Sequence, residues 1–430
     1  MLSAASLRYD GVGQNERIEI CAAGDVVVEP SDSDVCILAG VRTPFAEWAG
    51  GKNGVGKPGG AFKSVSALSL GSTALRGAIA RSGVAASELD HVVFGNALQT
   101  SPDSIYGARH VALGAGVPES VPALSVARIC GTGIQSVVSA SALIRLGDAR
   151  FVAAGGAENL SQAPFVVRGL RGVVKLGHYK FEDYFLNALH DPIADLNMAQ
   201  TAENLARIHG ISRREQDAFS LRSCREAARA KKAGFLKEEI VPVDLDKGRS
   251  FAEDDHCVED GTLESLAALR PAFGKEGCVT AGNASGVVDG ACAVVMASGL
   301  AVREKRLPVL GRLVSWAAAG VSPKEMGIGP VPAIRAALAR AGLALADIDL
   351  FEINEAFAAQ YLAVEKALGL DRDKVNVNGG AIALGHPLAA TGTRLILTVL
   401  LELRRRKKRY GVASACIGGG QGIAVVVEAA

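Results

Sequence analysis

The pattern of hydrophobic and polar positions divides the chain into short buried strands that alternate with helices. Strand-like apolar runs occur at Val35–Gly40, Leu350–Ile353, Gly411–Ala415 and Ile423–Glu428, and a long helix is expected at Gly133–Leu146. Short apolar runs bounded by glycine or polar residues are typical of strands that are covered on both faces. Strands that alternate with helices predict a layered α/β/α fold.

Two distant parts of the chain are related in sequence. Arg76–Asn96 and Arg335–Glu355 align at an offset of 259 residues, with the same residue at many positions. The same register then pairs Thr132 with Thr391, Gly133 with Gly392, Arg145 with Arg404 and Arg150 with Arg409. Two Ala-rich helices can match by chance, but a register that persists this far predicts two homologous α/β halves.

A charged and irregular segment lies between the halves. It contains helical patterns at Ala199–His209 and Arg213–Ala233. Insertions over a rigid scaffold often hold substrate. The predicted organisation is an N-terminal extension (1–36), a first half (37–158 plus 286–308), an inserted loop domain over the active site (159–285) and a second half (309–430).

Composition and charge narrow the range of functions. Of the 430 residues, 49% are hydrophobic, which excludes disorder as the main state. Lys and Arg number 46 against 45 Asp and Glu, so the net charge of +1 gives no general attraction to nucleic acid or to an anionic membrane. Aromatic residues make up only 5%, which weakens any case for base stacking. No nucleic-acid partner is expected.

The sequence also bears on location. No apolar run reaches the roughly 18 residues that a membrane-spanning helix requires, so no membrane span is expected. Asp10, Glu16 and Glu19 argue against a transit peptide. None of the eight cysteines forms a C-x-x-C pair, and a chain of this size needs no disulfides. We therefore expect a cytoplasmic protein.

Cys130 is the first candidate for chemistry. It lies in VARICGTGIQS, between an apolar stretch and the glycines Gly131 and Gly133. A strand, a turn of small residues and the helix Gly133–Leu146 would place the thiol at a helix N-terminus, where the dipole and exposed amides favour thiolate. Most cysteines are simply small buried hydrophobic residues, and the pattern leaves both interpretations open.

His386 lies at a similar glycine-rich entrance to a helix, NGGAIALGHPLAATGT. The repeat places position 130 opposite position 389, so Cys130 and His386 occupy nearby places in the two halves. A pseudo-twofold arrangement would bring both helix entrances to one cleft. A histidine near a cysteine lowers the thiol pKa and carries its proton. The alternative is a histidine that is hydrogen-bonded by neighbouring backbone.

Cys416 and the pair Asn354-Glu355 both follow predicted strands. The glycines after Cys416 suggest a dinucleotide loop, but Ile423–Glu428 is a strand and not the helix that a phosphate cradle requires. A second reactive thiol facing backbone amides fits better. Asn354 and Glu355 suit water positioning or an oxyanion donor, or else a helix N-cap with an acidic first turn.

Three further segments carry weaker signals. His256-Cys257 lies among acidic residues, but no second ligand pair lies nearby, so a solvated loop is preferred and no metal is expected. The Gly50–Gly60 segment is rich in glycine and lysine and is interpreted as a surface loop, with phosphate binding as the alternative. Arg404–Arg409 is interpreted as a solvated helix end whose cations complement the helix dipole.

After residue 35 or so, the chain resembles the thiolase family, which comprises acetyl-CoA C-acetyltransferases and 3-ketoacyl-CoA thiolases. The resemblance rests on CGTG (130–133), TAGNASGVVDGA (280–291), NEAFAAQ (354–360), NVNGGAIALGHPL (376–388) and CIGGGQG (416–422). It implies a thiolase-like α/β fold of duplicated α/β/α layered halves with an inserted loop domain. It also implies a CoA-dependent acyltransferase of fatty-acid metabolism that cleaves 3-oxoacyl-CoA with CoA, or condenses two acetyl-CoA to acetoacetyl-CoA.

The resemblance assigns roles to individual residues. Cys130 would be the nucleophile that becomes acylated, with His386 to activate it. Cys416 would be the general acid/base at the α-carbon of acetyl-CoA. Asn354 would hold a water that, with His386, forms one oxyanion hole, and the backbone N–H groups of Cys130 and Gly418 would form the other.

The resemblance also assigns contacts and partners. Ser285, Met198 and Phe357 match positions near the pantetheine of CoA, and Met326 matches a position beside the acyl pocket of short-chain members. Acyl-CoA and CoA would bind as substrates, with no other cofactor, and a homodimer or homotetramer is expected. The chain departs from many short-chain members at Asn197, where those have histidine.

Two other functions are considered. A decarboxylating ketoacyl synthase on the same fold would use a cysteine with two histidines, whereas this chain has Asn354 and a second cysteine, Cys416. A non-catalytic acyl-CoA- or lipid-binding homologue, such as a structural subunit of a β-oxidation complex, would be expected to lack one of the four catalytic residues, and none is missing here.

Overall fold

The computed structural model describes residues 30–50, 59–172, 176, 178–256, 261–274 and 276–430. Most of the predicted N-terminal extension and most of the Gly50–Gly60 loop lie outside these residues. The first described strand begins at Val35, two residues before the start that was predicted for the first half.

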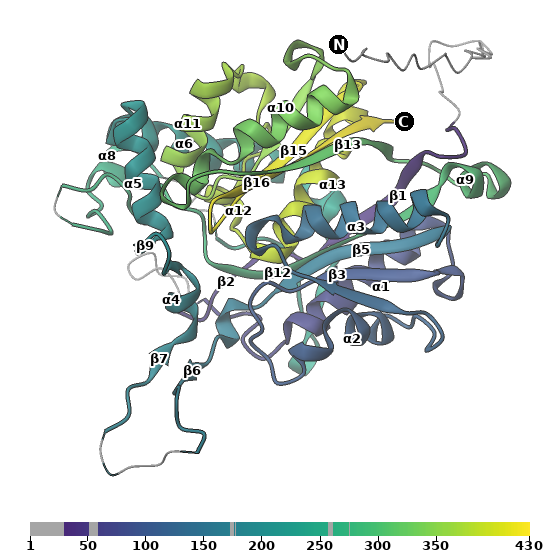
Figure 1. Ribbon diagram of the computed structural model, residues 1–430, viewed down its shortest axis with the longest axis horizontal. Helices are drawn as coiled ribbons and strands as arrows, with labels where there is room; N and C mark the ends of the chain where they lie inside the picture. Colours follow the sequence, from purple (N-terminus) through teal and green to yellow (C-terminus); the bar gives the residue numbers. More distant parts are fainter. Residues whose placement is uncertain (1–29, 51–58, 173–175, 177, 257–260, 275) are drawn as a thin grey trace, which may run out of the picture.

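A mixed ten-stranded sheet forms the centre of the molecule (Figure 1). Nine strands follow the order β14-β15-β16-β13-β1-β12-β5-β3-β4, and β2 (Ala46–Glu47) pairs with β12. Their bounds are β1 (Val35–Arg42), β3 (His91–Gly95), β4 (Ala123–Val126), β5 (Phe151–Glu158), β12 (Val288–Ser298), β13 (Gly311–Gly320), β14 (Leu350–Ile353), β15 (Tyr410–Ile417) and β16 (Gln421–Ala429). The two halves of the chain meet where β1 pairs with β13.

Helices cover the sheet in layers. They are α1 (Ala67–Ser82), α2 (Gly107–Gly114), α3 (Thr132–Leu146), α9 (Gly299–Lys305), α10 (Pro330–Ala341), α11 (Ala358–Leu368), α12 (Ala381–Leu384) and α13 (Leu388–Arg406). One hydrophobic cluster joins α1 and α2 to the first half, and another joins α10 and α11 to the second. A third cluster places α3 and α13 between the halves, so the predicted α/β layering is confirmed.

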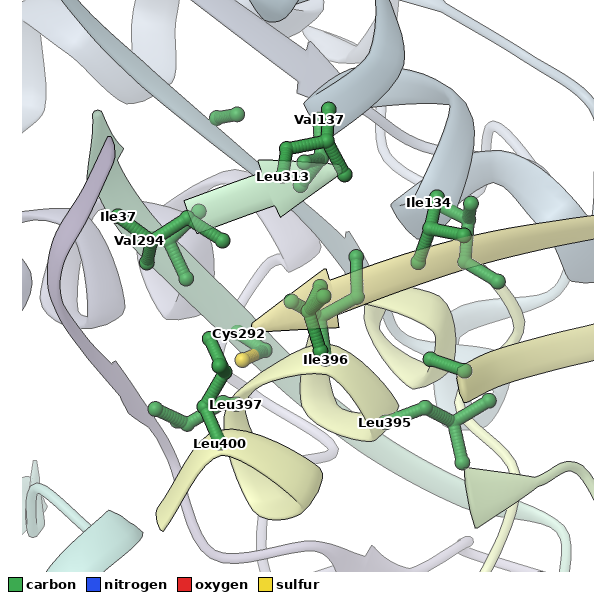
Figure 2. Packing of buried hydrophobic residues seen from close by; sticks show 14 of the residues in the cluster. Ile37, Ile134, Val137, Cys292, Val294, Leu313, Leu395, Ile396, Leu397 and Leu400 are labelled. Atoms are coloured by element: carbon green, nitrogen blue, oxygen red, sulfur yellow. The ribbon is translucent and has the colours of Figure 1, made fainter. Parts of the chain in front are cut away.

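Helix α13 fills the shared interior with its apolar side. Figure 2 shows Ile396, Leu397 and Leu400 in one cluster with residues of the first half, including Ile134 and Cys292. All five side chains are fully buried. Because one helix contacts strands of both halves, the halves cannot shift relative to each other without loss of this core.

The predicted repeat is a structural duplication. Strands β5 and β15 begin and end at the predicted offset. Asp90 accepts hydrogen bonds from the N–H groups of Arg150 and Phe151, at 2.7 and 2.9 Å. In the second half Asp349 does the same at the start of β15, at 2.9 and 3.0 Å. Equivalent side chains therefore hold equivalent turns, and the two halves were correctly predicted to be homologous.

The first turns of α3 and α13 touch through glycines. A Cβ built on Gly133 would lie 2.5 Å from Thr393 N and 2.7 Å from Ala389 O. A Cβ on Gly392 would overlap with the backbone nitrogen of Ile134. Thr393 also donates a hydrogen bond to the carbonyl of Gly133 at 3.0 Å. No side chain fits at either glycine, so the two helix entrances approach backbone to backbone.

The segment between β5 and β12 forms separate small elements. Its helices are α4 (Tyr184–Ala188), α5 (Met198–His209), α6 (Arg213–Lys232), α7 (Phe235–Glu239) and α8 (Leu263–Ala267). Its hairpins are β6–β7 (Phe165–Val166 and Glu182–Asp183), β8–β9 (His190–Asp191 and Leu196–Asn197) and β10–β11 (Val243–Leu245 and Arg249–Phe251). The helices predicted at Ala199–His209 and Arg213–Ala233 are confirmed as α5 and α6.

The interpretation of His256 as part of a solvated loop is wrong. Its side chain is buried, and Nδ1 contacts the carboxylate of Glu47. The neighbouring Asp254 forms a bidentate pair with the fully buried Arg42, at 2.7 and 2.8 Å. The acidic run therefore supplies partners for buried groups. Sequence alone does not show this, because Arg42 lies more than two hundred residues away. Cys257 lies outside the described residues.

The basic end of α13 is solvated, as predicted, because every residue of Arg404–Arg409 except the half-buried Arg405 is exposed. Arg405 and Arg406 both contact the carboxylate of Glu402, which lies one turn earlier on the same helix. The guanidinium of Arg405 also stacks over the ring of Phe235, 3.8 Å from its centroid. The cations follow the expected dipole arrangement, but local ion pairs hold them against the protein.

One helical run, Ile129–Leu146, is long and apolar enough by length and composition to cross a membrane, although the sequence pattern predicted none. It comprises α3 and the turn before it. Because 56% of this run is buried between the two halves, we assign its apolar character to the core of the protein.

Candidate active site

Cys130 lies in a short 3-10 helix, Ile129–Gly131, that leads from β4 into α3. Ile129 has a φ of +46°, a backbone conformation that a β-branched residue rarely adopts. A Cβ added to Gly131 would lie 2.6 Å from Cδ1 of Ile417, so a larger residue would require Ile417 to move. A strained residue on one side and a close contact with the other half fix the thiol at the boundary between the two halves.

The Cys130 thiol is neutral at rest. Its pKa is raised to about 11, mainly by burial and in smaller part by Glu158. Hydrogen bonds from the backbone N–H groups of Gly418 and Cys130 itself oppose this rise without cancelling it. The prediction that the helix N-terminus favours thiolate is therefore wrong for the free protein, because the cost of desolvation exceeds the effect of the amides.

The same two N–H groups mark a place where negative charge can be held. Gly418 follows β15, and its backbone N–H faces the sulfur of Cys130. Met198 lies beside the same glycine, because a Cβ built on Gly418 would lie 3.3 Å from Sδ of Met198. When an acyl group is attached to the Cys130 sulfur, its carbonyl carbon is bonded to that sulfur and carries an oxygen. Two backbone donors that converge on the sulfur can therefore also reach this oxygen. The pairing of Gly418 with Cys130 expected from the sequence is therefore seen in the structure.

His386 is held between two polar side chains. Its Nδ1 lies 2.7 Å from Oγ1 of Thr391, and its Nε2 lies 3.3 Å from Nδ2 of Asn354. Thr391 donates its own hydrogen to the carbonyl of Pro387 at 3.1 Å, so its oxygen is an acceptor for Nδ1–H. This arrangement gives the tautomer whose Nε2 carries a lone pair and can accept a proton.

The imidazole is neutral. The pKa of His386 is lowered to about 3, mainly by burial and in smaller part by the nearby cation Arg394. A neutral imidazole can accept a proton from a thiol but cannot stabilise a thiolate beforehand. The high pKa of Cys130 and the low pKa of His386 are therefore consistent with each other.

Asn354 has an unused acceptor. Its Oδ1 is buried, and no group in the described part of the chain donates a hydrogen bond to it. Buried acceptors are normally satisfied, so this oxygen is suited to a water or a substrate group. The N-cap alternative for Asn354-Glu355 is wrong. Helix α11 begins only at Ala358, and Glu355 is buried, where it accepts hydrogen bonds from Ser223 and Asn376.

Cys416 is the second thiol of the site. It is fully buried, and burial followed by the proximity of Cys130 raises its pKa above the usual range for a thiol. It packs in one small cluster with Met326, Ala356, Met198 and Phe357. A neutral thiol so close to Cys130 can supply a proton to carbon or sulfur in the space between them.

The residues predicted to contact CoA lie next to these groups. The N–H of Ser285 donates to the carbonyl of Ala356 at 3.0 Å, and Ala284 pairs with Phe357 in a β-bridge. This links the 280–291 segment to the 354–360 segment. Asn197 caps α5, with its side chain accepting from Ala199 N at 3.1 Å. Met198, Phe357 and Met326 thus share one cluster with Cys416, and Ser285 is hydrogen-bonded to Ala356 of the same cluster.

Two comparisons identify the family. The family models described as Thiolase, N-terminal domain and Thiolase, C-terminal domain match residues 35–299 and 307–429. The chain belongs to the thiolase family. It is 47% identical to beta-ketothiolase BktB of Cupriavidus necator and 44% identical to an acetyl-CoA acetyltransferase of that organism, over 92% of this chain and 99% of each relative.

Solved structures agree with this assignment. The thiolase is 46% identical to human mitochondrial 3-ketoacyl-CoA thiolase in complex with CoA, with a TM-score of 0.88 over 94% of this chain and all of the human chain. The predicted family, fold and enzyme class are therefore confirmed. The chain is an acyltransferase of acetyl-CoA and fatty-acid metabolism that catalyses thiolase Claisen cleavage or condensation.

Some residues of the thiolase site were not found by sequence reasoning. Thr391 was not predicted to hold His386, although it lies only five residues further along the chain. Glu158 was not predicted at all, and neither was Arg394, which lies on α13, the helix that follows His386. The described residues contain no group of three or more His, Cys, Asp or Glu side chains that could hold a metal ion.

The raised thiol pKa predicts how Cys130 reacts in the free thiolase. Only the thiolate is alkylated, so the rate of carbamidomethylation by iodoacetamide should rise about tenfold per pH unit from pH 7 to pH 10. The modification is followed at the Cys130 peptide by mass spectrometry, with Cys130→Ser as the control. A rate that levels off below pH 8.5 would contradict the neutral resting thiol.

Proposed function

We propose that this thiolase transfers acyl groups between CoA thiols through a thioester on Cys130. The observation that carries the proposal is the pairing of a neutral thiol with a neutral imidazole beside two converging backbone donors. Cysteine suits this role better than serine, because a thioester can pass its acyl group to another thiol with little change in energy. The proposed substrates are acyl-CoA and CoA, with no other cofactor.

In the cleavage direction, Nε2 of His386 takes the proton of Cys130 as the sulfur attacks the 3-oxo carbon of a 3-oxoacyl-CoA. The N–H groups of Cys130 and Gly418 hold the oxyanion that forms. The bond between C2 and C3 then breaks, and its electron pair remains on C2. Cys416 gives its proton to C2, which releases acetyl-CoA and leaves the acyl group on Cys130.

The second half of the cycle restores every proton. The Cys416 thiolate takes the proton of an incoming CoA thiol, and the CoA sulfur attacks the acyl carbon on Cys130. The Cys130 thiolate leaves and regains its proton from the His386 imidazolium. The buried acceptor of Asn354 is suited to a water that, with His386, polarises the thioester oxygen of acetyl-CoA. Run backwards, the same steps condense two acetyl-CoA.

The site also favours a short acyl group. Met326 is almost fully buried and packs beside Cys416, where it occupies space next to the reacting carbon. We therefore propose that four-carbon 3-oxoacyl-CoA is preferred over longer chains. A decarboxylating synthase and a non-catalytic binding protein are the other outcomes that an assay must separate.

The test is thiolysis of acetoacetyl-CoA and of a 3-oxoacyl-CoA with a long chain, with CoA added. We expect turnover of the short substrate, an acyl group found by mass spectrometry on Cys130, and complete loss of both in Cys130→Ala. Cys416→Ala should lower kcat by about 10²- to 10⁴-fold, because general acid–base catalysis is lost. Saturable acyl-CoA binding without turnover, or decarboxylation of a malonyl thioester, would contradict the proposal.

The edge of the sheet supports the proposed homodimer or homotetramer. Strand β4 lies at the end of the strand order, and its Leu124 is 47% exposed. Next to it, Ile105 and Tyr106 are 76% and 58% exposed, and this turn is tied to β4 by Ala108 N donating to Ser125 Oγ at 2.9 Å. An unpaired edge flanked by apolar side chains is suited to a second copy of the chain.

We expect Leu124→Asp to weaken self-association, because it places a charge in an apolar interface. Light scattering with size-exclusion chromatography measures the mass of each variant. Leu300→Asp, at an exposed leucine on α9, is the matched control and should keep the wild-type mass. An unchanged mass for Leu124→Asp would show that β4 is not the contact.

We also propose the cytoplasm as the location. Cys130 and Cys416 are not joined in a disulfide, and the mechanism needs both as thiols. Free thiols persist in reducing compartments. Recovery of the full chain with the cytosolic fraction of its own cells would support this proposal, and recovery inside a membrane-bounded compartment would contradict it.

A further inference from the structure

A buried carboxylate stands at the end of β5, close to the reacting groups. Glu158 is fully buried, and its two oxygens accept four hydrogen bonds. Oε1 accepts from Asn96 Nδ2 and Leu98 N, both at 2.9 Å, and Oε2 accepts from Ala97 N at 3.2 Å and Ala389 N at 3.1 Å. All four partners are N–H groups, which can only donate, so the site is matched to an ionised carboxylate.

These hydrogen bonds join two segments that the rest of the site depends on. Two of the backbone donors belong to the turn after β3, in the first half. The third belongs to Ala389 in the first turn of α13, three residues after His386. The carbonyl of the same Ala389 lies against Gly133, three residues after Cys130. Glu158 therefore ties the segment that carries His386 to the half that carries Cys130.

The duplication shows whether the fold itself needs a carboxylate at the position of Glu158. At the repeat offset of 259 residues, the position of Glu158 is occupied in the second half by Ile417. Ile417 packs against Gly131 at the entrance to α3. The end of β15 thus carries an apolar side chain where the end of β5 carries Glu158, so the duplicated fold requires no charge at this position. The carboxylate occurs only at the end of β5, which faces the start of α13 and the segment of His386.

The charge also acts on the nucleophile. Burial raises the pKa of Glu158 to about 7, while the N–H groups of Leu98, Ala389 and Ala97 oppose that rise. The nearby carboxylate of Asp289 raises it further. Glu158 in turn raises the pKa of Cys130, as a like charge does when it opposes formation of a thiolate.

We propose that Glu158 is a positioning residue of the thiolase reaction, which ties the first turn after His386 to the Cys130 half and, in its ionised form, places a negative charge near the thiol. This inference rests on the proposed function. Together with burial, which is the larger cause, this charge favours the protonated thiol until His386 accepts the proton during attack. The hydrogen bond to Ala389 keeps His386 within reach of that proton.

The test compares Glu158→Gln with Asp289→Asn. Asp289 is also fully buried, and it accepts from Ser161 N at 3.0 Å, so its variant controls for the loss of a buried carboxylate. Removal of the charge near Cys130 should make alkylation by iodoacetamide at pH 8 faster by about two- to tenfold in Glu158→Gln. The rate in Asp289→Asn should match the wild type. Equal rates in the two variants would overturn the inference.

A second variant separates charge from position. Glu158→Asp keeps the charge but shortens the reach to Ala389, so it should alkylate at close to the wild-type rate while kcat for thiolysis falls about tenfold or more and KM changes little. A wild-type kcat in Glu158→Asp would contradict the positioning role. Thermal melting shows which variants are folded. If Glu158→Gln does not fold, the kcat of Glu158→Asp still tests the positioning role.

The two proposals can fail separately. Alkylation of Cys130 needs no turnover, so it reports on Glu158 even in a protein that forms no acyl-enzyme. Absence of an acyl group on Cys130 in the wild type, with the expected alkylation difference present, would overturn the proposed function alone. An acyl-enzyme in the wild type with no alkylation difference would overturn only the role of Glu158.

Discussion

The backbone contact between the entrances of α3 and α13 sets the geometry of the whole site. Gly133 and Gly392 occupy equivalent positions in the two halves, and each lies against the helix of the other half. The contact leaves no room for a side chain, so the distance between the helix axes is fixed by backbone atoms. Cys130 precedes one of these helices and His386 the other. The two glycines therefore let the helix entrance that follows the nucleophile and the one that follows the base approach each other closely.

Within this frame, chemistry is carried by groups that burial keeps neutral. The thiols of Cys130 and Cys416 have raised pKa values, and that of His386 is lowered. Charge then develops only as the proton moves, in surroundings of low dielectric where backbone donors act strongly. Such a site protects its thiols at rest. It depends on alignment for rate, since no group is activated in advance.

Much of this arrangement could be predicted from the sequence. The repeat register predicted the halves, and β15 begins and ends where β5 does, shifted by that offset. The repeat offset and the glycine-rich helix entrances predicted that Cys130 and His386 would share a cleft, whereas the role of Cys416 beside them came from the resemblance to thiolases. The glycine-rich motifs are local in sequence, and the repeat is a constant offset. Both can therefore be recognised without knowing any three-dimensional contact.

What failed depends on contacts that the sequence does not display. The thiolate predicted for Cys130 assumed exposed amides, whereas burial decides its pKa. His256 was placed in solvent, because nothing near it in sequence shows that Glu47 would contact it. Glu158 follows a run of small residues in β5 and was passed over, since its donors come from segments some sixty and more than two hundred residues away.

The most direct measurement of the central claim is the rate of acyl transfer to Cys130 in a Gly392→Ala variant. Intact-mass analysis in a single turnover with acetyl-CoA measures this rate, and circular dichroism confirms that the variant is folded. Gly320→Ala is the control, because a Cβ at that position meets no atom within 4 Å. We expect acylation in folded Gly392→Ala to be slower by about 10²-fold, since small displacements of reacting groups have effects of this size. Acylation at the wild-type rate in that variant would contradict the account.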